Sequence, residues 1–118
     1  MQATKKRQTK IPLDKTEIHD HKDFVAKFYV KKEDGQPFNA LLVECNTRHH
    51  KTKLIKATRM YFVISGNGSF TINGRKEEAN PNDLFTIESG DVYEYSGKMR
   101  LIEVNVPPTD RSNEEKLE

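Results

Sequence analysis

The sequence contains a single cysteine, Cys45, and no tryptophan. One cysteine excludes an internal disulfide, and a reducing intracellular compartment is the natural setting for such a chain. Without tryptophan, a core must be built from Phe, Tyr, Leu, Ile and Val. Cys45 stands in the apolar run ALLVECN with no base beside it. We therefore expect it to be a small buried side chain and not a nucleophile.

Long apolar runs are also missing. No stretch approaches the roughly 20 apolar residues that a membrane-spanning helix needs. The basic start MQATKKRQTK is followed by IPLDKTE and by no apolar signal-peptide segment. The net charge of +2 is too small to indicate a nucleic-acid partner by itself. These absences predict a cytoplasmic protein without a membrane partner, and they make a nucleic-acid partner an unfavoured hypothesis.

What the chain does contain is a series of short β-type segments. Its 118 residues suffice for one domain, and no segment carries a 3.6-residue apolar period over three turns. GNG at 66–68 is expected to reverse the chain, and Asn73-Gly74 is the strongest two-residue hairpin signal. The expected strands are 24–30, 38–46, 51–58, 59–65, 69–73, LFTIE, DVYEYSG and KMRLIEVNV, the last one ended by Pro107-Pro108. The pattern predicts an all-β barrel or two-sheet roll of roughly eight to ten strands.

Both ends of the chain differ in composition from the middle. Residues 1–12 form a basic arm that carries Lys5, Lys6, Arg7 and Lys10, and residues 109–118 form a polar tail. The predicted barrel therefore spans residues 13–108. The arm lacks aromatic residues that stack on bases, which favours a solvated arm over a nucleic-acid-binding one. An interaction protein that uses the arm, with the barrel as support, stays open as an alternative.

The stretch YFVISGNGSFTINGR, followed by ANPNDLFTIESGDVYEYSGKMRLIEVNVPP, resembles a small single-domain cupin. The matching features are an apolar hairpin that ends in Gly-x-Gly, a turn at Asn-Gly and an N-D-x-x-x-I-x-x-G step. The resemblance covers about residues 38–108. It implies a double-stranded β-helix, the jelly-roll barrel of the cupins, which is usually dimeric and often holds a metal ion. On that analogy we expect a homodimer, in which the strand 24–30 covers an edge of its neighbour.

The metal-ligand positions of the two cupin motifs hold other residues in this sequence. Counted from Gly66 and Gly90, the aligned glycines, these positions are taken by Thr52 and Leu54 (or Lys53 and Ile55), Arg59 and Tyr93. Arg59 stands where the resemblance implies a glutamate ligand. An arginine keeps its proton and repels a cation. The resemblance therefore implies a cupin without a metal or other cofactor.

Four histidines remain as candidate metal ligands. His19 and His21 have the i, i+2 spacing of a strand face, but they precede the first matched strand. His49 and His50 are adjacent, so on a strand their side chains point to opposite faces and at most one enters the barrel. We expect both clusters to be solvated surface histidines.

The candidate ligand site lies on two strands. Arg59, Tyr61 and Val63 share one face of their strand by alternation, and the cupin register turns that face into the barrel. Tyr93 and Tyr95 would face it from a second strand. A guanidinium and several phenols suit a carboxylate, a phosphate or sugar hydroxyls. We therefore predict a small-molecule binding module for an anionic or polyhydroxylated, sugar-like ligand, with Arg59 and the three tyrosines as binding residues.

Two alternatives compete with this interpretation. In the first, Arg59 forms an internal ion pair with Glu88 or Glu103 and binds no ligand; the pair then only satisfies polar groups at the mouth of the barrel. In the second the protein is an enzyme, either a sugar-type isomerase or epimerase or a metal-dependent oxygenase. The isomerase version would use Tyr93 as general acid and His50 as base, provided that both face one cavity.

Overall fold

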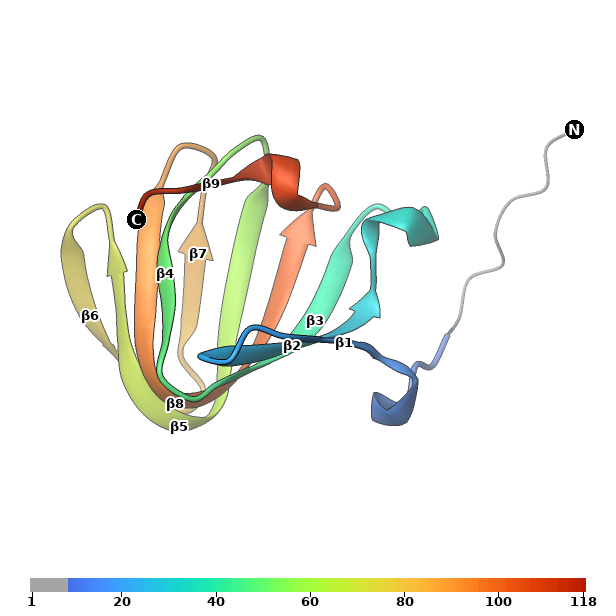
Figure 1. Cartoon of the computed structure of the whole chain (residues 1–118), viewed down its shortest axis with the longest axis horizontal. Coiled ribbons are helices and arrows are strands. Elements are labelled where there is room, and N and C mark those ends of the chain that lie inside the picture. Colours follow the sequence, from blue (N-terminus) through green and yellow to red (C-terminus); the bar gives the residue numbers. More distant parts are fainter. Residues whose placement is uncertain (1–8) are drawn as a thin grey trace, which may run out of the picture.

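The computed structural model describes residues 9–118, so most of the basic arm predicted for residues 1–12 lies outside the described residues. The described chain is almost entirely β-structure, as predicted (Figure 1). Its strands are β1 (Glu17–Asp20), β2 (Phe24–Val30), β3 (Asn39–Cys45), β4 (Arg48–Leu54), β5 (Thr58–Ile72), β6 (Arg75–Ala79), β7 (Leu84–Ile87), β8 (Val92–Val106) and β9 (Glu114–Lys116). Three short 3-10 turns, η1 (Leu13–Lys15), η2 (Lys32–Asp34) and η3 (Arg111–Asn113), complete the described part. No helix in residues 9–118 has the length and apolarity to cross a membrane.

The strands form one antiparallel sheet that curls back on itself (Figure 1). β8 is its central strand and pairs with β3, β4 and β5. The hydrogen-bonded order is β1-β2-β3-β8-β4-β9, and β5 connects β8 to β6 and β7. β2, which was predicted to cover a neighbour's edge, is instead paired on both sides, by β1 and by β3. β1 takes the edge position next to it.

The glycine-rich segment GNG was predicted to reverse the chain, and this prediction is wrong. β5 runs without a break through it and pairs with β8 on both sides of the bend. A Cβ on Gly66 would lie 2.0 Å from the carbonyl oxygen of Lys98, and one on Gly68 would lie 2.1 Å from that of Ser96. The two glycines therefore allow β5 and β8 to approach closely where both strands bend at the foot of the sheet (Figure 1). DVYEYSG and KMRLIEVNV, predicted as two strands, are likewise one strand, β8.

The turn at Asn73-Gly74 is the two-residue hairpin that the sequence indicates. Both residues have positive φ, 52° and 82°. Ile72 pairs with Arg75 directly across the turn. Positive φ at both central positions is the geometry that matches the twist of the flanking strands.

The last ten residues differ from the polar tail that the sequence indicates. β9 pairs with β4, and the Asn113 side chain donates to the Ile55 carbonyl at 2.8 Å. The Asp110 carboxylate accepts a hydrogen bond from the Ser112 backbone at 2.8 Å and so caps η3. Hydrogen bonds and ion pairs attach this segment to the sheet. Because these interactions need no apolar residues, the sequence carries no apolar pattern that would predict the attachment.

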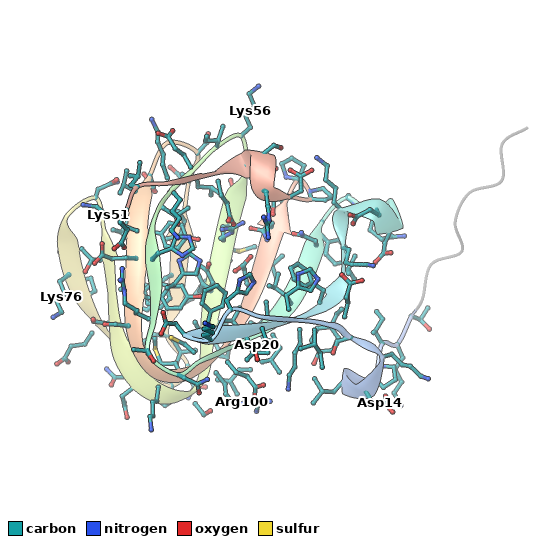
Figure 2. The ribbon with its side chains drawn as sticks, in the orientation of Figure 1. Asp14, Asp20, Lys51, Lys56, Lys76 and Arg100 are labelled. Atoms are coloured by element: carbon teal, nitrogen blue, oxygen red, sulfur yellow. The ribbon has the colours of Figure 1, made fainter. Side chains whose placement is uncertain are left out.

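The core lies on the inner face of the curled sheet. Arg59, Tyr61 and Val63 are all at most 2% exposed, whereas Phe62 between them is 38% exposed, so the predicted alternation is confirmed. Cys45 is buried as expected, and burial raises the pKa of its thiol to about 11. Charged side chains such as those of Lys56, Lys76 and Arg100 point outward from the sheet (Figure 2).

Candidate ligand-binding site

A cavity of about 580 Å³ lies against the inner face of the sheet. This volume is in the range of small-molecule sites. We call one part of its lining the aromatic wall, which consists of His21, Phe24, His49 and Tyr95. We call another part the polar end, which consists of Asn39, Arg59, Glu103, Thr109 and Glu114. β2, β3, β4, β5, β8 and the C-terminal segment all contribute to these two parts.

The rings of the aromatic wall contact one another in sequence. His21 stacks on Phe24 with centroids 4.6 Å apart, and Phe24 lies 4.9 Å from His49. His49 in turn stacks on Tyr95 at 5.0 Å and on Tyr93 at 5.6 Å. Ring contacts at these separations stabilise the wall and hold each ring in one orientation. The four residues therefore form one connected set of rings that lines part of the cavity.

His49 is held in one neutral tautomer. Its Nδ1 lies 2.8 Å from the backbone carbonyl oxygen of His50, and because a carbonyl only accepts, Nδ1 carries the proton. Nε2 is then a free acceptor, with no hydrogen bond from the residues that the structure describes. Burial, with a smaller contribution from His50, lowers the pKa of His49 to about 4. The imidazole is therefore an uncharged proton acceptor at neutral pH.

This burial makes stability depend on pH in a defined direction. Between the ordinary pKa of 6.5 and the folded value of about 4, the unfolded chain binds a proton at His49 and the folded chain does not. The stabilisation is therefore complete above pH 6.5 and is lost as the pH falls toward 4. We expect urea unfolding to show a loss of about 2–3 kcal/mol from His49 alone between about pH 7.5 and 4.5. His49→Phe should lack this loss, and the exposed control His19→Phe should retain it; equal pH dependence in both variants would refute the assignment.

Arg59 is buried and held by hydrogen bonds from several elements. Its Nε donates to the Asn105 side-chain oxygen, its Nη1 donates to the Tyr93 hydroxyl at 2.7 Å, and its Nη2 donates to the Thr109 hydroxyl at 3.3 Å. Asn105 is its direct cross-strand partner on β8. Every nitrogen of the guanidinium thus has a partner inside the protein.

Two carboxylates also face Arg59. Glu103 lies 3.3 Å from its Nε, and Glu114 of β9 lies 2.7 Å from its Nη1. Burial opposes the charge of the guanidinium, but Glu103, the two tyrosines and Glu114 outweigh it and hold the pKa of Arg59 well above its usual value. The sequence suggested Glu88 or Glu103 as an internal partner of Arg59, and the structure pairs Arg59 with Glu103. Its second ion-pair partner among the described residues is Glu114 and not Glu88.

The four predicted binding residues do not all reach the cavity. Arg59 and Tyr95 line it, whereas Tyr61 and Tyr93 are fully buried outside its lining. The hydroxyls of Tyr61 and Tyr93 lie 3.0 Å apart, and burial raises the pKa of Tyr93 to about 12. His50 lines the cavity but Tyr93 does not, so the suggested acid–base pair of Tyr93 and His50 does not meet in it.

All four histidines line this cavity, although the pair at 19 and 21 is far from the pair at 49 and 50 in the sequence. His19 and His21 are exposed at its mouth, as expected of surface histidines. His49, in contrast, is only 6% exposed, which corrects the expectation for that cluster. Within residues 9–118, no group of three or more His, Cys, Asp or Glu side chains is arranged to hold a metal ion. The residues present therefore do not fit the metal centre that the cupin resemblance associates with many relatives.

Two buried polar atoms of the described residues have no hydrogen-bond partner, the side-chain oxygen of Asn39 and the hydroxyl of Tyr95. Both residues line the cavity, Asn39 at the polar end and Tyr95 on the aromatic wall. An unpaired buried polar atom costs about 1–3 kcal/mol. Asn39 was not identified as a site residue from the sequence. The available signal was a polar residue on the inward face of β3, which otherwise carries Leu41 and Val43.

Comparison with solved structures shows that the chain has the cupin fold. A Streptomyces Pac13 variant solved with uridine has a TM-score of 0.84 at 20% sequence identity, over 95% of this chain and 92% of that chain. KdgF from Halomonas sp. gives 0.77 at 13% identity, over 90% and 99%. The cupin domain of Schizosaccharomyces pombe Cnp3 gives 0.71 at 17% identity, over 86% and 75%. No protein-family model and no curated protein sequence matches the chain.

These likenesses confirm the cupin-like double-stranded β-helix predicted from the sequence. At identities of this size they show the fold alone. The function has to be argued from the cavity.

Proposed function

We propose that the protein binds a small, polyhydroxylated molecule with a flat ring, such as a nucleoside, in the cavity. The observation that carries this proposal is the joint presence of the aromatic wall and of two unpaired buried polar atoms, on Asn39 and Tyr95. A flat ring packs well against stacked aromatic side chains. Both atoms are buried in the unliganded protein, so the proposal requires a small shift of the lining side chains that lets ligand hydroxyl groups supply the missing hydrogen bonds. A site with unpaired polar atoms gains most from a ligand that pairs them.

The solved structures support this choice of ligand class. Pac13 is described as a nucleoside dehydratase, and it was solved with uridine in variants that replace one histidine or either of two tyrosines. Those two tyrosines are 34 positions apart in Pac13, the same separation as between Tyr61 and Tyr95 in this chain. Of Tyr61 and Tyr95, only Tyr95 lines the cavity here, and it stacks on His49.

The neutral tautomer of His49 favours a second candidate function, proton-transfer catalysis on a ligand of the same class. In this version Nε2 of His49 takes a proton from a sugar carbon next to a carbonyl group, and the electron pair of the C–H bond passes to the carbonyl oxygen as an enolate. The imidazolium gives its proton to water, and water returns a proton to the opposite face of that carbon, as in an epimerase. The Tyr95 hydroxyl would donate a hydrogen bond to the carbonyl oxygen. Deuterium incorporation from D₂O into such a sugar, lost in His49→Gln, would establish catalysis; no incorporation leaves the binding function alone.

The binding proposal predicts saturable binding of uridine, ribose or a related polyhydroxylated compound by isothermal titration calorimetry. Tyr95→Phe should weaken the best of these ligands about five- to tenfold, because it removes one hydrogen bond. The same variant should melt at or above the wild-type temperature, since it removes an unpaired buried hydroxyl.

Tyr29→Phe is the matched control, because Tyr29 lies on β2 outside the cavity lining. It should leave the affinity unchanged. Absence of saturable binding by every compound of the panel up to about 10 mM, a concentration that detects affinities of about −3 kcal/mol, would refute the proposed function.

A further inference from the structure

We propose that the polar end of the cavity selects an uncharged hydrogen-bond donor, a hydroxyl or N–H group, and rejects carboxylate and phosphate, with Asn39 as the residue that sets this specificity. The inference rests on the proposed binding function and narrows it. It departs from the sequence expectation, in which Arg59 binds an anion.

Most donors of Arg59 are used within the protein. Nε donates to Asn105, Nη1 donates to Tyr93 and lies 2.7 Å from Glu114, and Nη2 donates to Thr109, so four of the five N–H groups are engaged and one on Nη2 is left. An oxyanion would therefore have to break a charge-assisted bond before it could accept from two nitrogens at once. The protein's own oxygens occupy most of the fork that binds carboxylate or phosphate elsewhere.

The amide donors of the neighbouring asparagines are used as well. The side-chain nitrogen of Asn105 donates to Glu103 at 2.9 Å, and that of Asn39 donates to the Thr109 carbonyl at 3.0 Å. This second bond also fixes the orientation of the Asn39 amide, because a carbonyl oxygen accepts only from the nitrogen side. The oxygen of Asn39 is thus left as an acceptor without a partner.

The charge balance of the polar end points the same way. One guanidinium, that of Arg59, faces two carboxylates, those of Glu103 and Glu114. The side chain of Glu103 is only 10% exposed, so solvent screens its charge weakly. Beside Arg59, an incoming anion would meet two carboxylates against one guanidinium, and an unpaired acceptor, and these oppose its binding there. The lining of the whole cavity is charge-balanced, because it also contains Lys31, Lys32, Arg111 and Lys116 together with Glu17, Glu33 and Asp110, so the selection is confined to the polar end. A hydroxyl or N–H group would meet an acceptor that gains a bond.

The experiment uses the side-chain amide signals of Asn39 in ¹⁵N–¹H NMR spectra, assigned from triple-resonance spectra of the wild type. Uridine serves as the neutral probe and inorganic phosphate as the anionic probe, at matched ionic strength. We expect uridine to shift the Asn39 signals and phosphate to leave them unchanged. Asn39→Leu should bind uridine about tenfold more weakly, whereas Asn67→Leu, which alters an exposed amide outside the cavity, should not.

Glu114→Gln is the reciprocal variant, and it also serves if Asn39→Leu fails to fold. It removes one of the two negative charges on Arg59, so phosphate should now shift the Asn39 signals. The inference is overturned if phosphate shifts the Asn39 signals in the wild type, or if Asn39→Leu binds uridine as tightly as the wild type does. It is also overturned if phosphate leaves the Asn39 signals of Glu114→Gln unchanged. If no neutral compound binds while phosphate behaves as expected in both proteins, the proposed function fails and the charge selectivity stands.

Discussion

Replacing Arg59 with methionine is expected to lower the free energy of unfolding by about 3–5 kcal/mol. Methionine fills much of the same volume but removes the positive charge. Glu103 is then left as a buried carboxylate without a cation, and Asn105 loses the donor that it accepts from. Breaking a buried pair by removing one partner costs far more than the pair contributes, because the remaining charge stays desolvated. Chemical denaturation at neutral pH measures the effect.

Arg100→Met is the matched control. Arg100 points outward from the sheet (Figure 2), its side chain is 45% exposed, and it lies 3.5 Å from Glu44. Such a surface pair contributes about 0–1 kcal/mol. Adding Glu103→Gln to Arg59→Met should restore part of the stability, because it removes the uncompensated charge. If Arg59→Met costs no more than the control, the buried network does not stabilise the fold as described.

Replacing Gly66 with alanine is expected to cost about 3 kcal/mol or more, enough to unfold a marginal domain. Gly66 has a φ of 86°, and its Cβ would lie 2.0 Å from the Lys98 carbonyl oxygen and 2.9 Å from the Met99 Cα. Both contacts are with backbone of β8, so only a separation of the two longest strands would relieve them. Circular dichroism during thermal unfolding measures the loss.

Gly35→Ala separates the steric effect from the conformational one. Gly35 has a similar φ of 75°, but a Cβ there would meet nothing within 4 Å. Its replacement should cost only the left-handed backbone term of about 1–2 kcal/mol. Equal costs at the two glycines would show that the close approach of β5 and β8 does not limit the choice of residue at the bend.

Much of the fold follows from local patterns in the sequence. Alternation on β5 correctly placed Arg59, Tyr61 and Val63 inside, and the turn at Asn73-Gly74 is a property of those two residues alone. The same logic failed at GNG, because glycine permits both a tight reversal and a close crossing of strands. Only the pairing with the distant β8 decides between these two uses.

The site was less accessible to sequence analysis, because its residues come from segments far apart in the chain. Arg59 and Tyr95 could be found from the cupin register. Asn39 and Glu114 could not, since their roles depend on contacts with Thr109 and Arg59 that no local pattern encodes. The polar composition of the C-terminal segment indicated a solvated tail, whereas ion pairs and hydrogen bonds attach it to the cavity.

The four histidines illustrate the same limit. Adjacent residues on a strand point to opposite faces, which correctly separates His49, at 6% exposure, from the half-buried His50. Which of the two enters the barrel depends on the register between β4 and β8, where His49 pairs with Tyr95. That pairing creates the aromatic wall, and it makes His49 the imidazole on which a catalytic function would depend.

A crystal structure of the protein in complex with uridine would show directly how the cavity holds its ligand. The proposal predicts the base ring packed against His49 and Phe24, a ligand hydroxyl or N–H group within hydrogen-bond distance of the Asn39 side-chain oxygen, and Arg59 still bound to Glu103 and Glu114. Uridine bound outside the cavity, or Arg59 released from both carboxylates to bind the ligand itself, would contradict it.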